Sequence, residues 1–390
     1  MRVGAVLGVV AAVLLVGPPV AQAAPATGAV PAVCAGREAP SGPPAVEETV
    51  AVPAVPVPAE PVGGARMGAC GDVLPDGAGP PPAVTATGWV VADLDTGAVL
   101  AAHDPHARER PASTLKILTT LVVRARLDPD AVVVATPEDV QVDGSRAGIG
   151  PGGQYTVRQL LTGLLLNSGN DCAMALARTL GGVPATLADM QQHAEALGAL
   201  DTRPATPSGL DGPGMSTSAY DLALLFRVAL RDQLVRETLA TRTVPFPGFA
   251  AKPGFLLSND DPLLGSYPGA LAGKTGFTDA ARHTFVGAAE RNGRRLIVAM
   301  VRGEQRPTRM VAQAAALLDY GFALSAASPV GTLVDARPAP PPQSTATALP
   351  AGAAAPAPVP SRAPWVVAGI ALLAVIAATA TVVVLRRRPR

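Results

Sequence analysis

The chain has 390 residues and carries 31 basic against 30 acidic side chains, a formal net charge of +1. This balance excludes the strong positive field that holds nucleic acids, and no basic run interleaved with aromatic residues indicates a surface for stacking bases. The 41 prolines gather in two regions that flank a more ordinary middle. We therefore expect one folded body between two proline-rich segments.

The N-terminus is typical of a signal peptide. An apolar run over residues 3–16 follows Arg2 and is too short to cross a bilayer, and Ala21-Gln22-Ala23 has the small residues of a cleavage site. We predict a signal peptide over residues 1–24, which directs the rest of the chain out of the cytoplasm. The alternative is a retained anchor helix, but the prolines that follow break the apolar run early.

Residues 25–84 consist mainly of Ala, Pro, Val and Gly, without the aromatic residues or the periodicity that a core needs. We predict a disordered spacer over this range. Cys34 and Cys70 lie within it and would meet an oxidising compartment after export, so the sequence is compatible both with a disulfide and with two free thiols. The folded domain is predicted over residues 85–324, a length sufficient for one substantial core.

The predicted body has strands at both ends and helices between them. Its elements, in chain order, are a hairpin of residues 89–93 and 98–102, a helix from about 113 to 127, two helices over 156–180 with a turn near 167–170, a hairpin around Asn292-Gly293 and a closing helix over 308–322. This order indicates an α+β fold in which the N- and C-terminal segments share one sheet.

The C-terminal part has the pattern of a membrane anchor. We predict a Pro/Ala-rich linker over residues 325–363 and a transmembrane helix over 364–386, which is long enough to cross a hydrocarbon core of about 30 Å. The basic tail, residues 387–390, should stay in the cytoplasm, which leaves the body outside the cell membrane in a single-pass arrangement. The alternative, a buried core helix, would need a polar face that this stretch lacks.

Ser113 and Lys116 carry the strongest chemical signal. On one helix they share a face, so that a hydroxyl lies beside an amine that can act as its base when burial lowers the pKa of the amine. Only three of the 31 basic residues are lysines, and arginine does not lose its proton in proteins. The simpler alternative is a serine N-cap followed by a solvated lysine.

Two further motifs follow in the chain. Ser168-Gly169-Asn170 lies in the predicted turn, where Ser168 can relay a proton and the Asn170 amide can hold a peptide backbone. Lys274-Thr275-Gly276 follows an apolar run, and on a strand edge its cation and hydroxyl can bind a carboxylate. Taken singly, the first is also an ordinary turn, and the second an edge lysine that prevents aggregation.

Together and in this order, the three motifs resemble the active site of penicillin-binding proteins and serine β-lactamases. Residues 88–323 resemble the D-alanyl-D-alanine carboxypeptidase family, peptidase family S11. The resemblance rests on the Asp93–Gly97 turn, Pro111-Ala112-Ser113, Leu165-Leu166-Asn167-Ser168-Gly169-Asn170-Asp171, Pro207-Ser208-Gly209-Leu210-Asp211 and Leu317-Leu318-Asp319-Tyr320-Gly321-Phe322. Ser-Gly-Asn favours these carboxypeptidases over class A β-lactamases, which usually carry Ser-Asp-Asn.

The resemblance implies a β-lactamase/transpeptidase-like fold, with an antiparallel sheet flanked by helices and a helical lobe. It implies that Ser113 is acylated, that Lys116 takes its proton and that Ser168 assists the transfer. It further implies a substrate site of Asn170, Lys274, Thr275 and Gly276, and an oxyanion hole formed by the backbone N–H groups of Ser113 and Phe277. Arg282 and His283 are bulkier than expected after this motif and predict an altered subsite.

The implied activity is a serine-type carboxypeptidase that removes the terminal D-alanine from peptidoglycan stem pentapeptides and is acylated by penicillins. D,D-endopeptidase or weak β-lactamase activity at the same site, and a catalytically silent cell-wall-binding module, are the alternatives. The partners are therefore peptidoglycan stem peptides, β-lactams and, through the C-terminal helix, the membrane.

The remaining metal-ligating residue types do not form a recognisable site. His103, His106, His193 and His283 lack zinc spacing, and the first two straddle a loop dipeptide, so we expect them at the surface. Cys172 has no nearby histidine in the sequence and is expected to be a small buried residue. We predict no metal and no cofactor.

Overall fold

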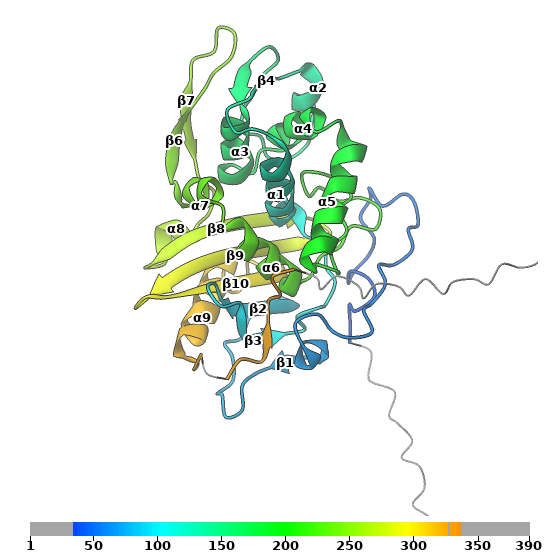
Figure 1. The fold of residues 1–390 in the computed structure, drawn as a ribbon, viewed down its shortest axis with the longest axis vertical. Helices are drawn as coiled ribbons and strands as arrows, with labels where there is room; N and C mark the ends of the chain where they lie inside the picture. The colour runs from blue at the N-terminus through cyan, green and yellow to red at the C-terminus, as the bar shows by residue number, and fades with distance from the viewer. Residues whose placement is uncertain (1–33, 327, 337–390) are drawn as a thin grey trace, which may run out of the picture. The chain divides into compact units, whose positions relative to one another are not determined.

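A computed structural model of the chain describes residues 34–326 and 328–336 (Figure 1). The predicted signal peptide over 1–24, the transmembrane helix over 364–386 and the basic tail over 387–390 lie outside these residues. Within the described ranges, no helix combines the length and the apolar character needed to cross a membrane.

A seven-stranded antiparallel sheet forms the centre of the described body, as the predicted α+β fold requires. Six strands lie in the order β1 (Asp72–Val73), β3 (Ala98–His103), β2 (Gly88–Asp93), β10 (Arg294–Gly303), β9 (Arg282–Arg291) and β8 (Ala270–Thr278), and β11 (Gly331–Thr332) pairs with β3. Both predicted hairpins are confirmed. In the first, the Asp93 carboxylate accepts the backbone N–H groups of Asp95 and Thr96, which fixes the turn.

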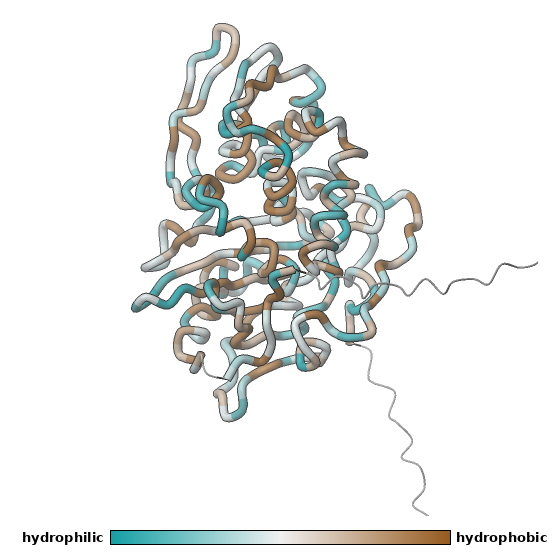
Figure 2. Tube along the Cα trace, viewed as in Figure 1, coloured by the Kyte–Doolittle hydropathy of each residue, from teal (hydrophilic) through white to brown (hydrophobic). Residues whose placement is uncertain are grey.

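Helices cover both faces of the sheet, and each face has its own apolar core. The closing helix α9 (Met310–Ala323) packs on one face, where Leu317 joins Trp89 and Phe285. On the other face, α6 (Ala219–Ala229) and α1 (Lys116–Arg126) pack with strand residues such as Ile297. Figure 2 shows the apolar segments gathered along these strands and helices.

A helical lobe lies between the two halves of the sheet in the chain. Its elements are the 3-10 turn η2 (Ala112–Leu115), α1, β4 (Val132–Val134), α2 (Pro137–Val140), β5 (Gln154–Thr156), α3 (Val157–Leu166), α4 (Asn170–Thr179), α5 (Val183–Leu197), α7 (Gln233–Ala240), β6 (Thr243–Phe246), β7 (Phe255–Ser258) and α8 (Leu263–Ser266). The predicted pair of helices is confirmed as α3 and α4. Thr156 begins α3 with a reciprocal capping box to Gln159, and the chain turns between the two helices at residues 167–169.

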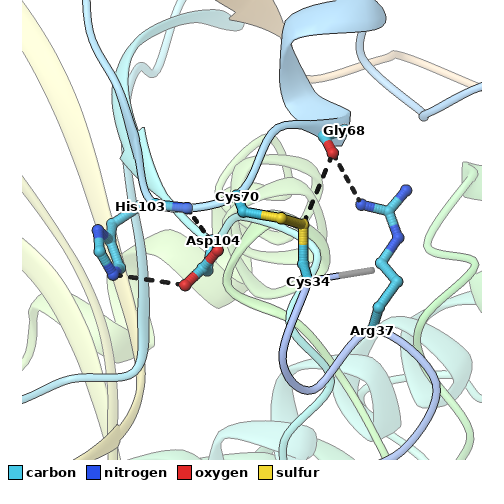
Figure 3. Close-up of a disulfide and its surroundings, with 7 residues drawn as sticks. Cys34, Arg37, Gly68, Cys70, His103 and Asp104 are labelled. Carbon is cyan, nitrogen blue, oxygen red and sulfur yellow. Dashed lines mark hydrogen bonds and ion pairs between the residues drawn. A yellow bond between two sulfur atoms is a disulfide. The ribbon is translucent and has the colours of Figure 1, made fainter. Parts of the chain in front are cut away.

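The predicted disordered spacer over residues 25–84 is wrong for the part that the structure describes. Residues 34–84 pack on the body, with η1 (Ala65–Gly68) and β1 among them, and Met67 is fully buried. Cys34 and Cys70 form a disulfide beside the Gly68 carbonyl (Figure 3). The amino-acid composition wrongly indicated disorder because the segment builds no core of its own. It packs instead on a surface of the folded body.

The predicted linker over residues 325–363 also begins too early. Val330 and Leu333 are buried, and β11 between them extends the sheet along β3. Asp335 then pairs with Arg227 of α6 at 2.7 Å. Two buried apolar side chains and a short pairing suffice to order this stretch, although its composition resembles that of the residues that follow.

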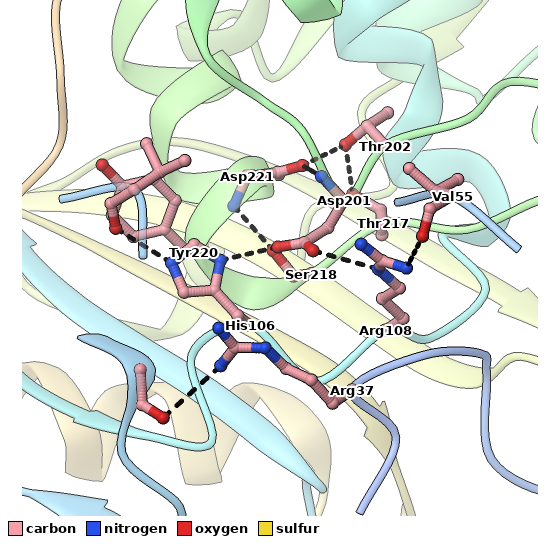
Figure 4. Close-up of polar contacts among 12 residues, drawn as sticks. Arg37, Val55, His106, Arg108, Asp201, Thr202, Thr217, Ser218, Tyr220 and Asp221 are labelled. Carbon is pink, nitrogen blue, oxygen red and sulfur yellow. Dashed lines mark hydrogen bonds and ion pairs between the residues drawn. The ribbon is translucent and has the colours of Figure 1, made fainter. Parts of the chain in front are cut away.

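The expected surface position of His106 is wrong, because its side chain is only 5% exposed. Its Nδ1 lies 2.6 Å from an Asp201 carboxylate oxygen and its Nε2 3.0 Å from the Val62 carbonyl (Figure 4). Burial lowers the pKa of His106, but the hydrogen bond and the charge of Asp201 outweigh it, so the pKa is raised. Because these bonds occupy both ring nitrogens, we interpret the cluster as a structural network. His103, which is half-buried, pairs with Asp72.

Asp221 should contribute less to the free energy of unfolding as the pH rises. Burial raises the pKa of Asp221, beside this cluster, from 3.8 to about 8, so its contribution is complete below pH 3.8 and is lost as the pH passes about 8. The raised pKa of His106 acts in the same direction above its ordinary value of 6.5. One pKa unit corresponds to about 1.4 kcal/mol, so between pH 4 and 9 we expect the parent to lose on the order of a few kcal/mol relative to Asp221→Asn in urea unfolding. Asp221→Asn should flatten this dependence, and an unchanged slope would contradict the assignment.

Candidate active site

The predicted Ser113–Lys116 pair is brought together by the start of α1. Ser113 lies in the 3-10 turn η2, and Lys116 is the first residue of the α-helix. The Lys116 Nζ lies 2.8 Å from the Ser113 Oγ. A hydroxyl and an amine are therefore within direct proton-transfer distance, as the i, i+3 spacing predicts.

Two glycines allow backbone segments to approach the turn that carries Ser113. A Cβ on Gly209 would lie 1.9 Å from the Ala112 carbonyl oxygen, and Gly209 itself has a φ of +85°. A Cβ on Gly276 would lie 2.9 Å from the Ser113 backbone nitrogen. Ala112 has a φ of 47°, a left-handed conformation that residues with a Cβ rarely adopt. The nucleophile turn is thus held between β8 and the 207–211 segment in a conformation that the surroundings impose.

Lys116 is fully buried and hydrogen-bonded on three sides. Besides Ser113, its Nζ contacts the Asn170 Oδ1 at 2.7 Å and the Ser208 carbonyl oxygen at 2.6 Å. Burial lowers the pKa of Lys116 well below its ordinary value, and the positive charge of Lys274 lowers it further. Both effects favour the neutral amine, the form that can accept a proton.

The second motif lies at the turn before α4. Ser168 is buried with a φ of 57°, and its Oγ has no hydrogen-bond partner within the described ranges. Asn170 is the first residue of α4, and its Nδ2 donates to the Asp143 carbonyl at 2.6 Å while its Oδ1 faces Lys116. The motif therefore has one free hydroxyl and one amide that is already engaged.

The third motif lies on β8, an edge strand of the sheet, as predicted. Lys274 is fully buried rather than open to solvent, with its Nζ 3.0 Å from the Thr275 carbonyl oxygen and 3.8 Å from Asp260. Burial lowers the pKa of Lys274, although nearby acidic groups oppose this. Asp260 was not found from the sequence because nothing in its local pattern links it to the motif.

A cavity of about 160 Å³ adjoins β8 and is lined by Thr275, Gly276, His283 and Arg309, among others. Arg309 is exposed and immediately precedes α9. It therefore brings a positive charge to the cavity that Thr275 lines. Sequence analysis missed Arg309, since one arginine among 28 carries no local signal. A larger cavity of about 460 Å³ elsewhere in the described body is lined by none of the motif residues, so volume alone does not mark the site.

Phe277 and the residues opposite it shape the edge of the site. Phe277 is 49% exposed, and its ring lies 4.5 Å from the ring of His283, its partner on β9. The Arg282 guanidinium lies over the Phe277 ring, 5.8 Å from its centre, and pairs with Glu304 at 2.8 Å. The bulky residues that the sequence singled out thus form an aromatic and charged wall next to Gly276.

Cys172 is a buried residue, as predicted. It lies in α4 against the position of Gly163, where an added Cβ would approach its sulfur to 2.6 Å. Burial raises the pKa of the thiol well above its ordinary value, which keeps it protonated and unreactive.

Comparison with known proteins identifies relatives for most of this body. Residues 76–305, more than half of the chain, match the peptidase S11 family, described as D-alanyl-D-alanine carboxypeptidase. The D-alanyl-D-alanine carboxypeptidase DacB2 of Mycobacterium tuberculosis is 48% identical over 267 residues, which are 67% of this chain and 91% of the relative.

Solved structures agree with this match. The crystal structure of a D-alanyl-D-alanine carboxypeptidase from Mycobacterium tuberculosis H37Rv is 47% identical, with a TM-score of 0.64, and the match covers 66% of this chain and 99% of that one. The Streptomyces K15 DD-transpeptidase is 29% identical, with a TM-score of 0.60, over 63% of this chain and 100% of that one.

Proposed function

The chain belongs to the D-alanyl-D-alanine carboxypeptidase family, and we propose that it removes the terminal D-alanine from peptidoglycan stem pentapeptides through a serine acyl-enzyme. The observation that carries this proposal is the 2.8 Å contact between the Ser113 Oγ and the Nζ of a buried lysine. The lowered pKa of Lys116 supplies the base that a serine nucleophile needs.

The hydrogen bonds around Lys116 support acylation. A neutral amine has two N–H groups, which Asn170 and Ser208 accept, and one lone pair, which is left for the Ser113 proton. The Ser113 Oγ then attacks the carbonyl carbon between the two D-alanines. The new oxyanion is held by the backbone N–H groups of Ser113 and Phe277, and the missing Cβ of Gly276 lets β8 approach Ser113.

The expelled D-alanine needs a proton at its nitrogen, and the acyl-enzyme then needs water. The buried, unpartnered hydroxyl of Ser168 is suited to relay the proton from Lys116 to this nitrogen. Water attacks the ester carbonyl, its proton returns through Lys116 and the stem peptide leaves with one residue fewer. Penicillins acylate Ser113 in the same way, because their strained amide presents a carbonyl and a carboxylate at similar positions.

The terminal carboxylate of the substrate is bound by the third motif. The Thr275 hydroxyl and the Arg309 guanidinium line one cavity and are suited to hold the two carboxylate oxygens. Lys274 is buried, directly precedes Thr275 on β8 and adds positive potential for the same carboxylate. Gly276 keeps the strand close enough to Ser113 for a bound peptide to reach the nucleophile.

The enzyme acts outside the cytoplasm and is anchored to the cell membrane by its C-terminal helix. This part of the proposal is supported by the sequence alone, through the signal peptide pattern of residues 1–24 and the apolar stretch of 364–386 followed by arginines. Its substrates, peptidoglycan stem peptides, lie in the same compartment.

The activity is tested by incubating the full chain with diacetyl-Lys-D-Ala-D-Ala and measuring free D-alanine, and separately by recording the intact mass after benzylpenicillin. We expect release of one D-alanine per peptide and a mass gain of one penicillin per chain. Release without turnover of penicillin distinguishes a carboxypeptidase from a β-lactamase. If neither release nor a mass gain occurs, the catalytically silent cell-wall-binding module becomes the better interpretation.

A further inference from the structure

The N-terminal segment of residues 34–62 lies ahead of the part of the chain that matches the carboxypeptidase family, which begins at residue 76. It nevertheless packs against the residues that lead to the nucleophile. We propose that this segment is a clamp on residues 108–110, the extended stretch before Ser113, and that Glu48 within it is a positioning residue for the reaction. The proposal rests on the proposed function, since it concerns the alignment of the same serine.

The segment contacts each of the three consecutive residues 108–110. The Arg108 guanidinium is almost fully buried and donates to the backbone carbonyls of Glu38, Val55 and Pro56. The Arg108 backbone N–H donates to the Gly36 carbonyl at 2.7 Å. The clamp therefore binds this residue through both its side chain and its backbone.

The next two residues are held by side chains of the segment. The Glu109 carboxylate accepts the Ser41 hydroxyl. The Arg110 Nε donates to the Glu48 carboxylate at 2.5 Å, and the side chains of Arg110 and Glu48 are only 4% and 16% exposed. A charge buried to this degree is costly when its partner is removed, because water cannot replace the lost contact.

Only two residues separate Arg110 from Ser113. Pro111 is conformationally rigid, and its carbonyl oxygen accepts hydroxyls from Thr114 at 2.6 Å and from Thr284 of β9 at 2.8 Å. Ala112 follows in its left-handed conformation. This short stretch has little freedom to absorb a displacement, so a movement of Arg110 reaches the Ser113 Oγ.

Loss of the Glu48 carboxylate should therefore misalign the nucleophile without removing any group that touches substrate. A misplacement of about 1 Å can cost about a hundredfold in rate. Because the substrate-binding residues lie on β8, at the start of α4 and before α9, we expect kcat to fall and KM to stay nearly constant.

The test compares Glu48→Ala, Glu48→Asp and Arg203→Ala in the full chain, with kcat and KM measured for D-alanine release. Arg203 donates to the Pro53 carbonyl at 2.7 Å, so its variant removes one contact of the same segment and leaves the Glu48–Arg110 pair in place. We expect Glu48→Ala to lower kcat by between about tenfold and a hundredfold. Glu48→Asp should restore most of the rate, and Arg203→Ala should behave as the parent.

Hydrogen exchange of the backbone amides of residues 109–116, followed by mass spectrometry, reports on the clamp independently of activity. It should accelerate in Glu48→Ala and stay at the parental rate in Arg203→Ala. The proposal is overturned if Glu48→Ala keeps the parental kcat and exchange rate, if KM alone changes, or if Arg203→Ala loses as much activity. An inactive parent would count against the proposed function, whereas the exchange data would still decide on the clamp.

Discussion

Replacing Ser113 with alanine should abolish both D-alanine release and the covalent mass gain from benzylpenicillin. The variant removes only the Oγ that lies 2.8 Å from the Lys116 Nζ, and the remaining contacts of Lys116 with Asn170 and Ser208 are retained. Without a nucleophile no acyl-enzyme forms, so we expect a loss of at least about a thousandfold in kcat/KM. Intact mass after penicillin and the rate of D-alanine release measure the two effects separately.

Ser266→Ala is the matched control, because Ser266 is an exposed serine of α8 whose hydroxyl donates to the Pro262 carbonyl. It should acquire one penicillin and release D-alanine as the parent does. Covalent labelling of Ser113→Ala would assign the nucleophile to another residue, and the buried hydroxyl of Ser168 would be the first to test.

Local patterns predicted most of the architecture. The turn at Asp95-Thr96-Gly97 and the one at Asn292-Gly293 produce the hairpins β2–β3 and β9–β10, as turn chemistry predicts. The spacing of Ser113 and Lys116 predicted their contact, because three residues of helix set that distance. Family membership, which the order of the three motifs indicated, is confirmed.

The predictions failed where order depends on surfaces distant in the sequence. The segment of residues 34–62 is bound through its carbonyl oxygens, which Arg108 and His106 contact, and backbone acceptors leave no trace in composition. The same holds for β11, whose two residues pair with β3 more than two hundred positions earlier. Local sequence contains no information about such partners.

The site itself was predicted in its residue types but not in its environment. The sequence treats Lys274 as a cation at the surface of a strand, whereas the fold buries it near Asp260 and within the field of Lys116. Burial is a property of the whole packed body, and it lowers the pKa of Lys274. The lowered pKa of Lys116 has the same origin.

Replacing Lys116 with arginine should reduce acylation by at least about a thousandfold, because it places a permanent cation where the parent holds a neutral amine. Arginine keeps its proton in proteins, so it cannot take the proton of Ser113. The parent should acylate faster as the pH rises through the lowered pKa of Lys116, because only the neutral amine acts as a base. The variant should lack this rise in the rate of penicillin acylation with pH. Lys252→Arg, at an exposed site over the Phe249 ring, is the matched control and should keep the parental profile. A Lys116→Arg variant that kept the rate and its rise with pH would show that another group removes the Ser113 proton, and the contacts of Lys116 would then serve only to hold Ser113 and Asn170 in position.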